Sequence, residues 1–183
     1  MTRGWSAVVG LAAFIMAASG AELQYTKDGK MLLPADYREW IFLSSGLGMT
    51  YGPAGRTDAQ GHPRFDNVFV SPAAYRSFLR TGQWPDRTVL ILEVRDSQSD
   101  VSINTSGHVQ GRVLALEAHV KDTARFPGGW AFFGFQNSAT AKLIPISANC
   151  YSCHGQHGAV DTTFVQFYPT LQDAAQKHGT LKH

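Results

Sequence analysis

The chain has 183 residues, with 16 lysines and arginines against 14 aspartates and glutamates and a formal net charge of +2. This near balance excludes the strong positive field expected of a protein that binds nucleic acid or an anionic membrane surface. The length suits one domain with its own hydrophobic core.

Residues 1–21 are typical of a secretory signal peptide. Arg3 is followed by an apolar run from Trp5 to Ala18, and small residues then lead up to Glu22. The run is short for a membrane span, and an uncleaved anchor is the competing interpretation. We therefore predict an exported, periplasmic protein whose single domain comprises residues 22–183.

Local signals organise the first half of that domain. Proline or a capping residue marks the start of two helices, and a glycine follows the end of the second one. A stretch with five glycines and two prolines is too irregular for either regular structure. These patterns predict, in chain order, a short helix over 34–40, a loop over 44–63, a strand over 67–70 and a helix over 71–80.

Alternating and branched apolar residues dominate the second half. Large aromatic residues on both sides of residues 130–136 indicate a strand with two buried faces. The patterns predict strands over 88–95, 108–121, 130–136 and 163–167, and a terminal helix over 169–178. The expected fold class is therefore α+β, with a small, mainly antiparallel β-sheet and flanking helices.

The two cysteines of the chain lie in Cys150-Tyr151-Ser152-Cys153-His154, near the C-terminus. Two thiols at this spacing can reach the two vinyl groups of one porphyrin, and the adjacent imidazole then lies under the iron. The motif predicts one covalently attached haem c, with Cys150 and Cys153 as thioethers and His154 as the proximal iron ligand. The competing interpretations are a disulfide, a thioredoxin-like redox pair and half of a zinc site, for which His157 alone adds too few ligands.

The second axial ligand is not evident from the sequence. No methionine follows Cys150, and the domain holds only Met31 and Met49, both upstream in a region that looks irregular. We therefore expect no methionine ligand. The predicted strands also exclude the four-helix bundle of cytochromes c′.

Several segments together resemble the cytochrome P-460 family, which includes the β-sheet relatives called cytochrome c′-beta. The resemblance rests on residues 69–75, 84–90, 130–135, 150–154 and 167–169. It implies a homodimer of an antiparallel-sheet protein and a five-coordinate haem whose distal side is open to small ligands.

The family contains two groups of proteins with different activities, and their haems differ in one covalent bond to the protein. The P-460 enzymes oxidise hydroxylamine with a haem that is linked to a lysine of the sheet, whereas the c′-beta relatives lack the link and bind nitric oxide. This chain has no lysine between residues 31 and 120, and Leu92 takes the expected place of the cross-linking lysine. Lys121 and Lys142 are the remaining candidates.

Polar residues on the predicted strands are candidates for the distal side of the haem, where a proton acceptor would assist oxidation of hydroxylamine. His108 ranks first, because it opens a strand after Ser106-Gly107, and it could also be a sixth ligand. The other candidates are Glu93, Glu117 and His119. The competing interpretations are ordinary edge-strand histidines and an ion pair of Glu93 with Arg95 or Arg112. Aromatic residues that could wall the haem, or belong to the core, are Phe69, Phe132 and Phe133.

The sequence thus predicts an exported mono-haem c-type cytochrome that binds or redox-processes a small nitrogen oxide species, nitric oxide or hydroxylamine, without a lysine cross-link. Its expected partners are that small ligand, a redox protein and a second copy of the chain, and not nucleic acid. A haem-dependent oxidoreductase activity stays open. The alternatives are a six-coordinate electron-transfer cytochrome and a true hydroxylamine oxidoreductase.

Overall fold

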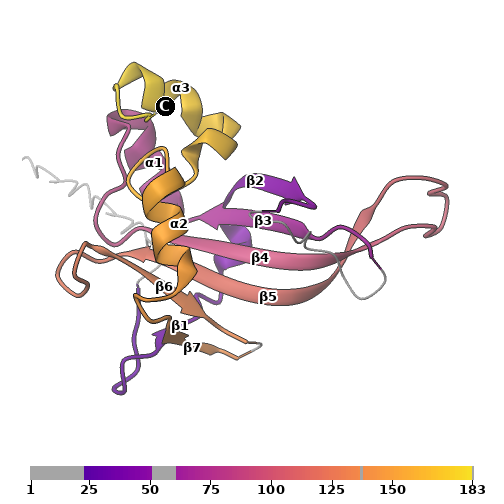
Figure 1. Ribbon diagram of the computed structural model, residues 1–183, viewed down its shortest axis with the longest axis horizontal. Helices are drawn as coiled ribbons and strands as arrows, with labels where there is room; N and C mark the ends of the chain where they lie inside the picture. Colours follow the sequence, from indigo (N-terminus) through magenta and orange to yellow (C-terminus); the bar gives the residue numbers. More distant parts are fainter. Residues whose placement is uncertain (1–22, 51–60, 137, 183) are drawn as a thin grey trace, which may run out of the picture.

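A computed structural model describes residues 23–50, 61–136 and 138–182. The predicted signal peptide and the middle of the predicted loop 44–63 therefore lie outside the described residues. The described chain forms a seven-stranded antiparallel sheet in the order β1-β7-β6-β5-β4-β3-β2, with three α-helices (Figure 1). This architecture confirms the predicted α+β class.

The strands are β1 (Met31–Leu32), β2 (Ile41–Leu47), β3 (Phe65–Val70), β4 (Val89–Gln98), β5 (Val109–Lys121), β6 (Trp130–Gly134) and β7 (Thr140–Leu143). The helices are α1 (Pro72–Thr81), α2 (Asn149–His157) and α3 (Pro169–Lys177), with two 3-10 turns, η1 (Tyr37–Glu39) and η2 (Val165–Phe167). None of the helices in the described ranges is long and apolar enough to cross a membrane.

The strongest local signals gave the right elements. Strands β3 to β6 and helices α1 and α3 lie where the sequence predicts them. Pro72 occupies the first turn of α1, and Gly82 ends that helix with a left-handed backbone at φ 68°. Because glycine adopts this conformation without a steric cost, it stops the helix at the predicted place.

Several local predictions were wrong. The stretch that contains β1 was expected to have no regular structure, and the helix predicted over 34–40 is only the 3-10 turn η1. Residues 44–47, expected in a loop, belong to β2, whose small and polar residues pair with β3. Strand β7 was not predicted at all, because its polar residues form a strand by pairing with β1 and β6. Residues 163–167 do not form a strand, since the chain turns at 160–163 and continues as η2. Strands β2 and β7 depend on non-local contacts that sequence periodicity does not report, whereas the turn at 160–163 and η2 are held by hydrogen bonds between residues three positions apart.

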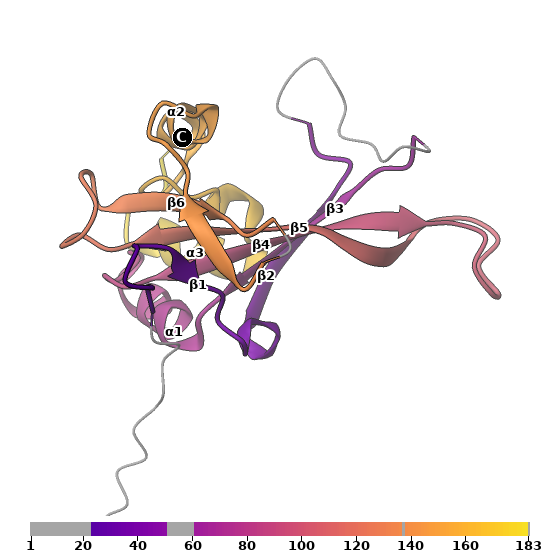
Figure 2. The same ribbon diagram turned by 90° about the horizontal axis from the view of Figure 1, so that it is seen from below.

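The sheet separates two hydrophobic clusters, because neighbouring residues of a strand point to opposite faces. On β4, Val89 and Ile91 belong to the cluster covered by the N-terminal segment, whereas Leu90 belongs to the cluster beneath α1 and α3. The aromatic residues of β6 are buried on both sides, as predicted. The far end of the β4–β5 hairpin projects beyond the rest of the sheet as an arm (Figures 1 and 2).

Candidate functional site

Helix α2 carries the two cysteines and the adjacent histidine of the motif. Residues three and four positions apart lie on one side of a helix, so Cys150, Cys153 and His154 are presented together. The two thiols are not joined in a disulfide. All three residues line the same cavity, which has a volume of about 340 Å³.

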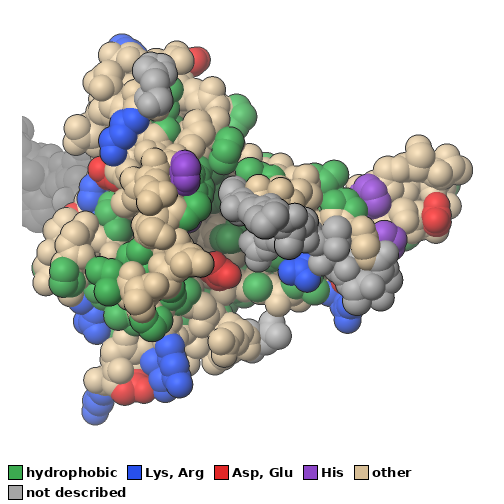
Figure 3. All heavy atoms as spheres, viewed as in Figure 1, with side chains coloured by type: hydrophobic (Ala, Val, Ile, Leu, Met, Phe, Trp, Pro, Cys, Tyr) green, Lys and Arg blue, Asp and Glu red, His purple; other side chains and the backbone are tan. Residues whose placement is uncertain are grey.

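The cavity lies between α2 and the end of β2, above the central strands of the sheet. Figure 3 shows a hollow there with hydrophobic side chains inside it. Its aromatic lining is Phe132, Phe164, Phe167 and Tyr168, and its aliphatic lining is Val68, Leu90, Leu92 and Ala118. The polar and sulfur-containing residues at the rest of its surface are Ser44, Met49, Asp66, Glu117, His119 and Asn149.

The imidazole of His154 is held by one backbone carbonyl. Its Nδ1 donates to the Thr162 carbonyl at 2.7 Å. Burial lowers the pKa of His154 below its ordinary value, against the opposing effect of that hydrogen bond. When the neutral ring carries its proton on Nδ1, Nε2 has a free lone pair. An imidazole binds a metal ion through such a nitrogen.

Gly158 allows Thr162 to come so close to His154. A Cβ atom at residue 158 would lie 2.6 Å from the His154 carbonyl oxygen and 2.9 Å from the Thr162 Cα. Both are backbone atoms, which cannot move aside as a flexible side chain could. Glycine at this position therefore lets the chain fold back against α2.

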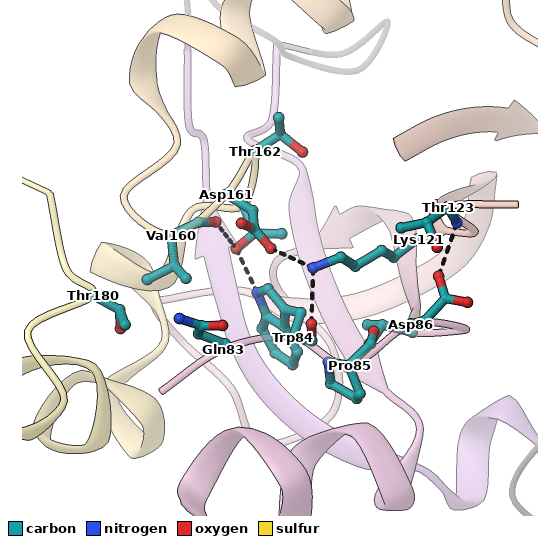
Figure 4. A network of polar contacts seen from close by, with 12 residues as sticks. Gln83, Trp84, Pro85, Asp86, Lys121, Thr123, Val160, Asp161, Thr162 and Thr180 are labelled. Atoms are coloured by element: carbon teal, nitrogen blue, oxygen red, sulfur yellow. Dashed lines mark hydrogen bonds and ion pairs between the residues drawn. The ribbon is translucent and has the colours of Figure 1, made fainter. Parts of the chain in front are cut away.

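A network of polar contacts fixes the segment that carries Thr162 (Figure 4). Trp84 Nε1 donates to the Thr163 hydroxyl at 2.8 Å, and that hydroxyl donates to the Val160 carbonyl at 2.8 Å. Lys121 Nζ donates to Asp161 at 2.9 Å and to the Trp84 carbonyl at 2.8 Å. Asp161 has a positive φ of 51°, an unfavourable conformation for a residue with a side chain, which these contacts offset.

His119, on β5, belongs to the surroundings of His154. The two rings meet edge to face with centroids 4.9 Å apart, and His119 stacks on Phe132 at 4.0 Å. The Thr162 hydroxyl and His119 Nε2 are hydrogen-bonded at 3.1 Å. Burial, and then the nearby His154, hold the pKa of His119 well below its ordinary value, so His119 is neutral at pH 7.

The two residues that the sequence ranked first for the distal side, His108 and Glu93, do not line the cavity. Glu93 points to the opposite face of β4, where it is 2% exposed and accepts from Tyr37 at 2.6 Å and from Arg95. Its pairing with Arg95 confirms the competing interpretation. His108 is exposed in the loop between β4 and β5, 3.5 Å from the Ser97 hydroxyl.

The other predicted candidates divide in the same way. Glu117 lines the cavity, because it pairs with Leu92 in the β4–β5 register and shares its face. Of the three aromatic candidates, Phe132 lines the cavity, whereas Phe69 and Phe133 pack in the cluster on the other face. Asp66 also lines the cavity, although it lies just before the predicted strand 67–70. Asp66 and Val68 alternate onto one face of β3.

The family comparison agrees with this geometry. The family model described as cytochrome P-460 matches residues 34–165, a range that contains strands β2 to β7 and the motif. The chain belongs to the cytochrome P-460 family. It is therefore a c-type haem cytochrome, as the sequence predicted. A search of curated proteins finds no match.

The residues of this cytochrome P-460 protein fit a haem at the cavity. Two thiols and a neutral imidazole stand on one wall, and the remaining surface is mostly apolar and aromatic. A zinc site has no comparable support, because no group of three metal-ligating side chains occurs in the part of the chain that the structure describes.

No lysine lies at the cavity of this cytochrome P-460 protein. All six lysines belong to the described residues, and none of them lines the cavity. Lys121 is bound to Asp161 and the Trp84 carbonyl, and Lys142 is exposed on β7. Leu92, at the place expected for a cross-linking lysine, does line the cavity.

Proposed function

We propose that this protein is an exported, periplasmic mono-haem c-type cytochrome that binds or redox-processes a small nitrogen oxide species, nitric oxide or hydroxylamine. The observation that carries the proposal is the wall formed by Cys150, Cys153 and His154 along one side of an apolar cavity. The thiols would form the two thioether bonds, and His154 Nε2 would bind the iron. The haem supplies the redox centre and the iron position at which a small ligand binds.

The residues of the chain then have separate tasks. The Thr162 carbonyl orients His154 and keeps its proton on Nδ1, which makes Nε2 available. The apolar and aromatic lining would surround the porphyrin. Ser44, Asp66 and Glu117 bring polar groups to its surface. Glu117 replaces Glu93 and His108 as the leading candidate to accept a proton from a bound ligand.

We further propose that the haem carries no lysine cross-link. The absence of Lys121 and Lys142 from the cavity lining and the presence of Leu92 within it support this part of the proposal. A haem without this link resembles that of the c′-beta relatives, which bind nitric oxide. Hydroxylamine oxidation is the second candidate activity, and Glu117 is the observation in its favour.

The partners that we propose are a redox protein and a second copy of the chain. Strand β2 is an edge of the sheet, and its exposed apolar residues Phe42 and Leu47 support a homodimer contact there. Sedimentation of the purified protein tests this assembly. A monomer at all concentrations would contradict it.

The proposed function is tested by expressing the full chain in a host that matures cytochromes c. We expect haem that survives denaturation, found in a proteolytic peptide that contains residues 150–154 and no other segment. Ferrous protein should bind nitric oxide. Colourless protein, or protein that loses its haem on denaturation, would contradict the proposal.

A Glu117→Gln variant separates the two candidate activities. Where the wild-type protein turns over hydroxylamine, the variant should be slower by about 100-fold, because general base catalysis typically contributes at least that factor. Glu39→Gln is the matched control, since Glu39 is exposed on η1 and does not line the cavity. Nitric oxide binding without hydroxylamine turnover would assign the protein to ligand binding alone.

A further inference from the structure

His119 is a buried histidine beside the proposed iron ligand, and the proposed function gives it no task. It is 8% exposed and belongs to β5, whereas His154 belongs to α2. Burying an imidazole costs free energy unless its polar atoms are hydrogen-bonded, so an apolar side chain would fill this place at a lower cost. The presence of a histidine here therefore needs an explanation other than packing.

The ring of His119 is in contact with β6 and with the ring of His154. It stacks on Phe132, with centroids 4.0 Å apart and an interplanar angle of 10°. The ring of Trp130, also on β6, lies 4.4 Å away. His119 meets the ring of His154 edge to face, at 4.9 Å and 76°. Because the aromatic residues of β6 hold it, His119 presents a fixed edge to His154.

The ring of His154 touches aromatic rings from three parts of the chain. His119 belongs to β5, Phe132 to β6 at 4.7 Å, and Phe164 to the segment before η2 at 4.3 Å. A ring enclosed by such contacts cannot turn freely, because its neighbours are close-packed. The plane of the His154 imidazole is therefore set by side chains that do not belong to α2.

A hydrogen bond ties His119 to the residue that holds His154. His119 Nε2 and the Thr162 hydroxyl are 3.1 Å apart, and the Thr162 carbonyl accepts from His154 Nδ1 at 2.7 Å. The side chain of Thr162 is thus bound to β5 while its carbonyl is bound to α2. Loss of the imidazole at residue 119 would take this partner from the hydroxyl and allow the carbonyl to shift.

The position of the Thr162 carbonyl matters for the iron that His154 would bind. A hydrogen bond from Nδ1 to a carbonyl makes an imidazole a stronger donor through Nε2. A stronger donor stabilises ferric iron relative to ferrous iron, so it lowers the reduction potential. The strength of the hydrogen bond depends on how well donor and acceptor are aligned.

We infer that His119 is a positioning residue for the iron ligand, which fixes the plane of the His154 ring by contact and aligns the Thr162 carbonyl through its own hydrogen bond. The inference rests on the proposed attachment of haem to α2 with His154 as the proximal ligand. It concerns the side of the haem that His154 occupies. It therefore agrees with an opposite side that is open to small ligands, as the family resemblance implies.

The experiment uses the haem-loaded full chain and three substitutions at residue 119. His119→Leu removes the ring and the hydrogen bond, His119→Phe keeps an aromatic ring without the hydrogen bond, and His119→Gln offers an amide in place of Nε2. The two readouts are the iron–histidine stretching frequency in resonance Raman spectra of the ferrous protein, and the reduction potential. A residue that only stabilises the fold would move neither readout.

His119→Leu and His119→Phe should lower the stretching frequency and raise the reduction potential, because the carbonyl is no longer aligned with His154 Nδ1. The shifts should be larger in His119→Leu, which also loses the ring contact. His119→Gln should bring both values back toward those of the wild-type protein. Phe133→Leu is the matched control, since Phe133 is a buried ring of β6 in the cluster on the other face of the sheet. It should lower the stability without moving either readout.

The outcomes separate this inference from the proposed function. Wild-type values of both readouts in His119→Leu would overturn the inference and leave haem attachment intact. Wild-type values in His119→Phe would overturn the role of the hydrogen bond. Wild-type protein without covalently bound haem would overturn the inference and the proposed function together. If His119→Leu fails to fold, His119→Phe and His119→Gln decide, because each of them keeps one of the two features.

Discussion

His154 and His119 are joined through one residue, Thr162. The carbonyl of Thr162 accepts from His154 Nδ1 at 2.7 Å, and its hydroxyl is bonded to His119 Nε2 at 3.1 Å. A single threonine therefore hydrogen-bonds both the motif helix and strand β5, and the contacts of Trp84 and Lys121 with the neighbouring residues hold it in place. The orientation of the proposed iron ligand depends on residues outside the motif.

Gly158→Ala adds only one methyl group, but it should disturb the contact between His154 and Thr162 strongly. The added methyl group would meet the backbone of His154 and Thr162, so α2 and the following segment must separate. We expect a loss of about 1–3 kcal/mol in the free energy of unfolding, as in other overpacked sites. Urea unfolding of the haem-loaded protein measures it.

Gly155→Ala is the matched control for that substitution. Gly155 lies within α2, and a methyl group there meets nothing within 4 Å. Because alanine favours a helix, we expect a gain of about 0.5–1 kcal/mol in stability. Equal effects of the two substitutions would show that the close contact at residue 158 does not matter.

Thr162→Val should remove the hydrogen bond of His119 and leave that of His154 in place. The variant keeps the backbone carbonyl that holds His154 but loses the hydroxyl that is bonded to His119, which is 8% exposed. An unsatisfied buried nitrogen costs about 1–3 kcal/mol, so thermal unfolding should show a loss of this size. The absorption spectrum should keep its axial-ligand features. Thr81→Val, at the exposed end of α1, serves as the control.

Lysine variants test the absence of a cross-link. Lys121→Met should leave the haem spectrum unchanged and lower the stability, because Asp161 and the Trp84 carbonyl lose their partner. Lys142→Met should change neither property, since Lys142 is exposed on β7. Absorption spectra and urea unfolding measure both. A spectrum that changes strongly in either variant would assign that lysine to the haem.

The lowered pKa of Glu93 leads us to expect that the free energy of unfolding depends on pH. Burial alone would raise the pKa of Glu93, but hydrogen bonds from Arg95 and Tyr37 outweigh it and lower the pKa below the ordinary 4.5. A carboxylate with a lowered pKa in the folded state stabilises the protein above the unfolded-state value. That stabilisation is lost as the pH falls below about 4.5 toward the lowered pKa of the folded state.

Glu93→Gln should therefore be less stable than the wild-type protein at pH 7, by about 3 kcal/mol, because Arg95 loses its buried partner. The difference should shrink as the pH falls below 4.5, the ordinary pKa of the carboxyl. Urea unfolding at a series of pH values measures it. Glu39→Gln, at an exposed residue of η1, should show no such trend. A constant difference at all pH values would contradict the proposed role of the charge.

The parts of the fold that were predictable are those whose signals are local. Pro72 and Gly82 set the two ends of α1 through their own backbone preferences. The spacing of the cysteines and the histidine from Cys150 to His154 predicts haem attachment without any knowledge of the fold. Strand β2 was missed because Ser44, Ser45 and Gly46 are typical of loops, and only pairing with β3 makes them a strand.

The residues that α2 contributes to the candidate site were predictable from the sequence. The residues that the strands contribute to the cavity lining were not. Choosing among Glu93, Glu117 and His108 requires knowing which face of each strand points to the cavity. That choice follows from the register of β4 and β5, which contains two irregularities between Val94 and Ser97.

The position of β2 at the edge of the sheet has a consequence for assembly. The outer side of β2 can pair with another strand, and residues 44 and 46 of the same strand line the cavity. Association at this edge would act on one wall of the cavity. By thermodynamic linkage, a change in dimer affinity on ligand binding requires an equal change in ligand affinity on dimerisation. The apparent affinity for carbon monoxide would then vary with protein concentration.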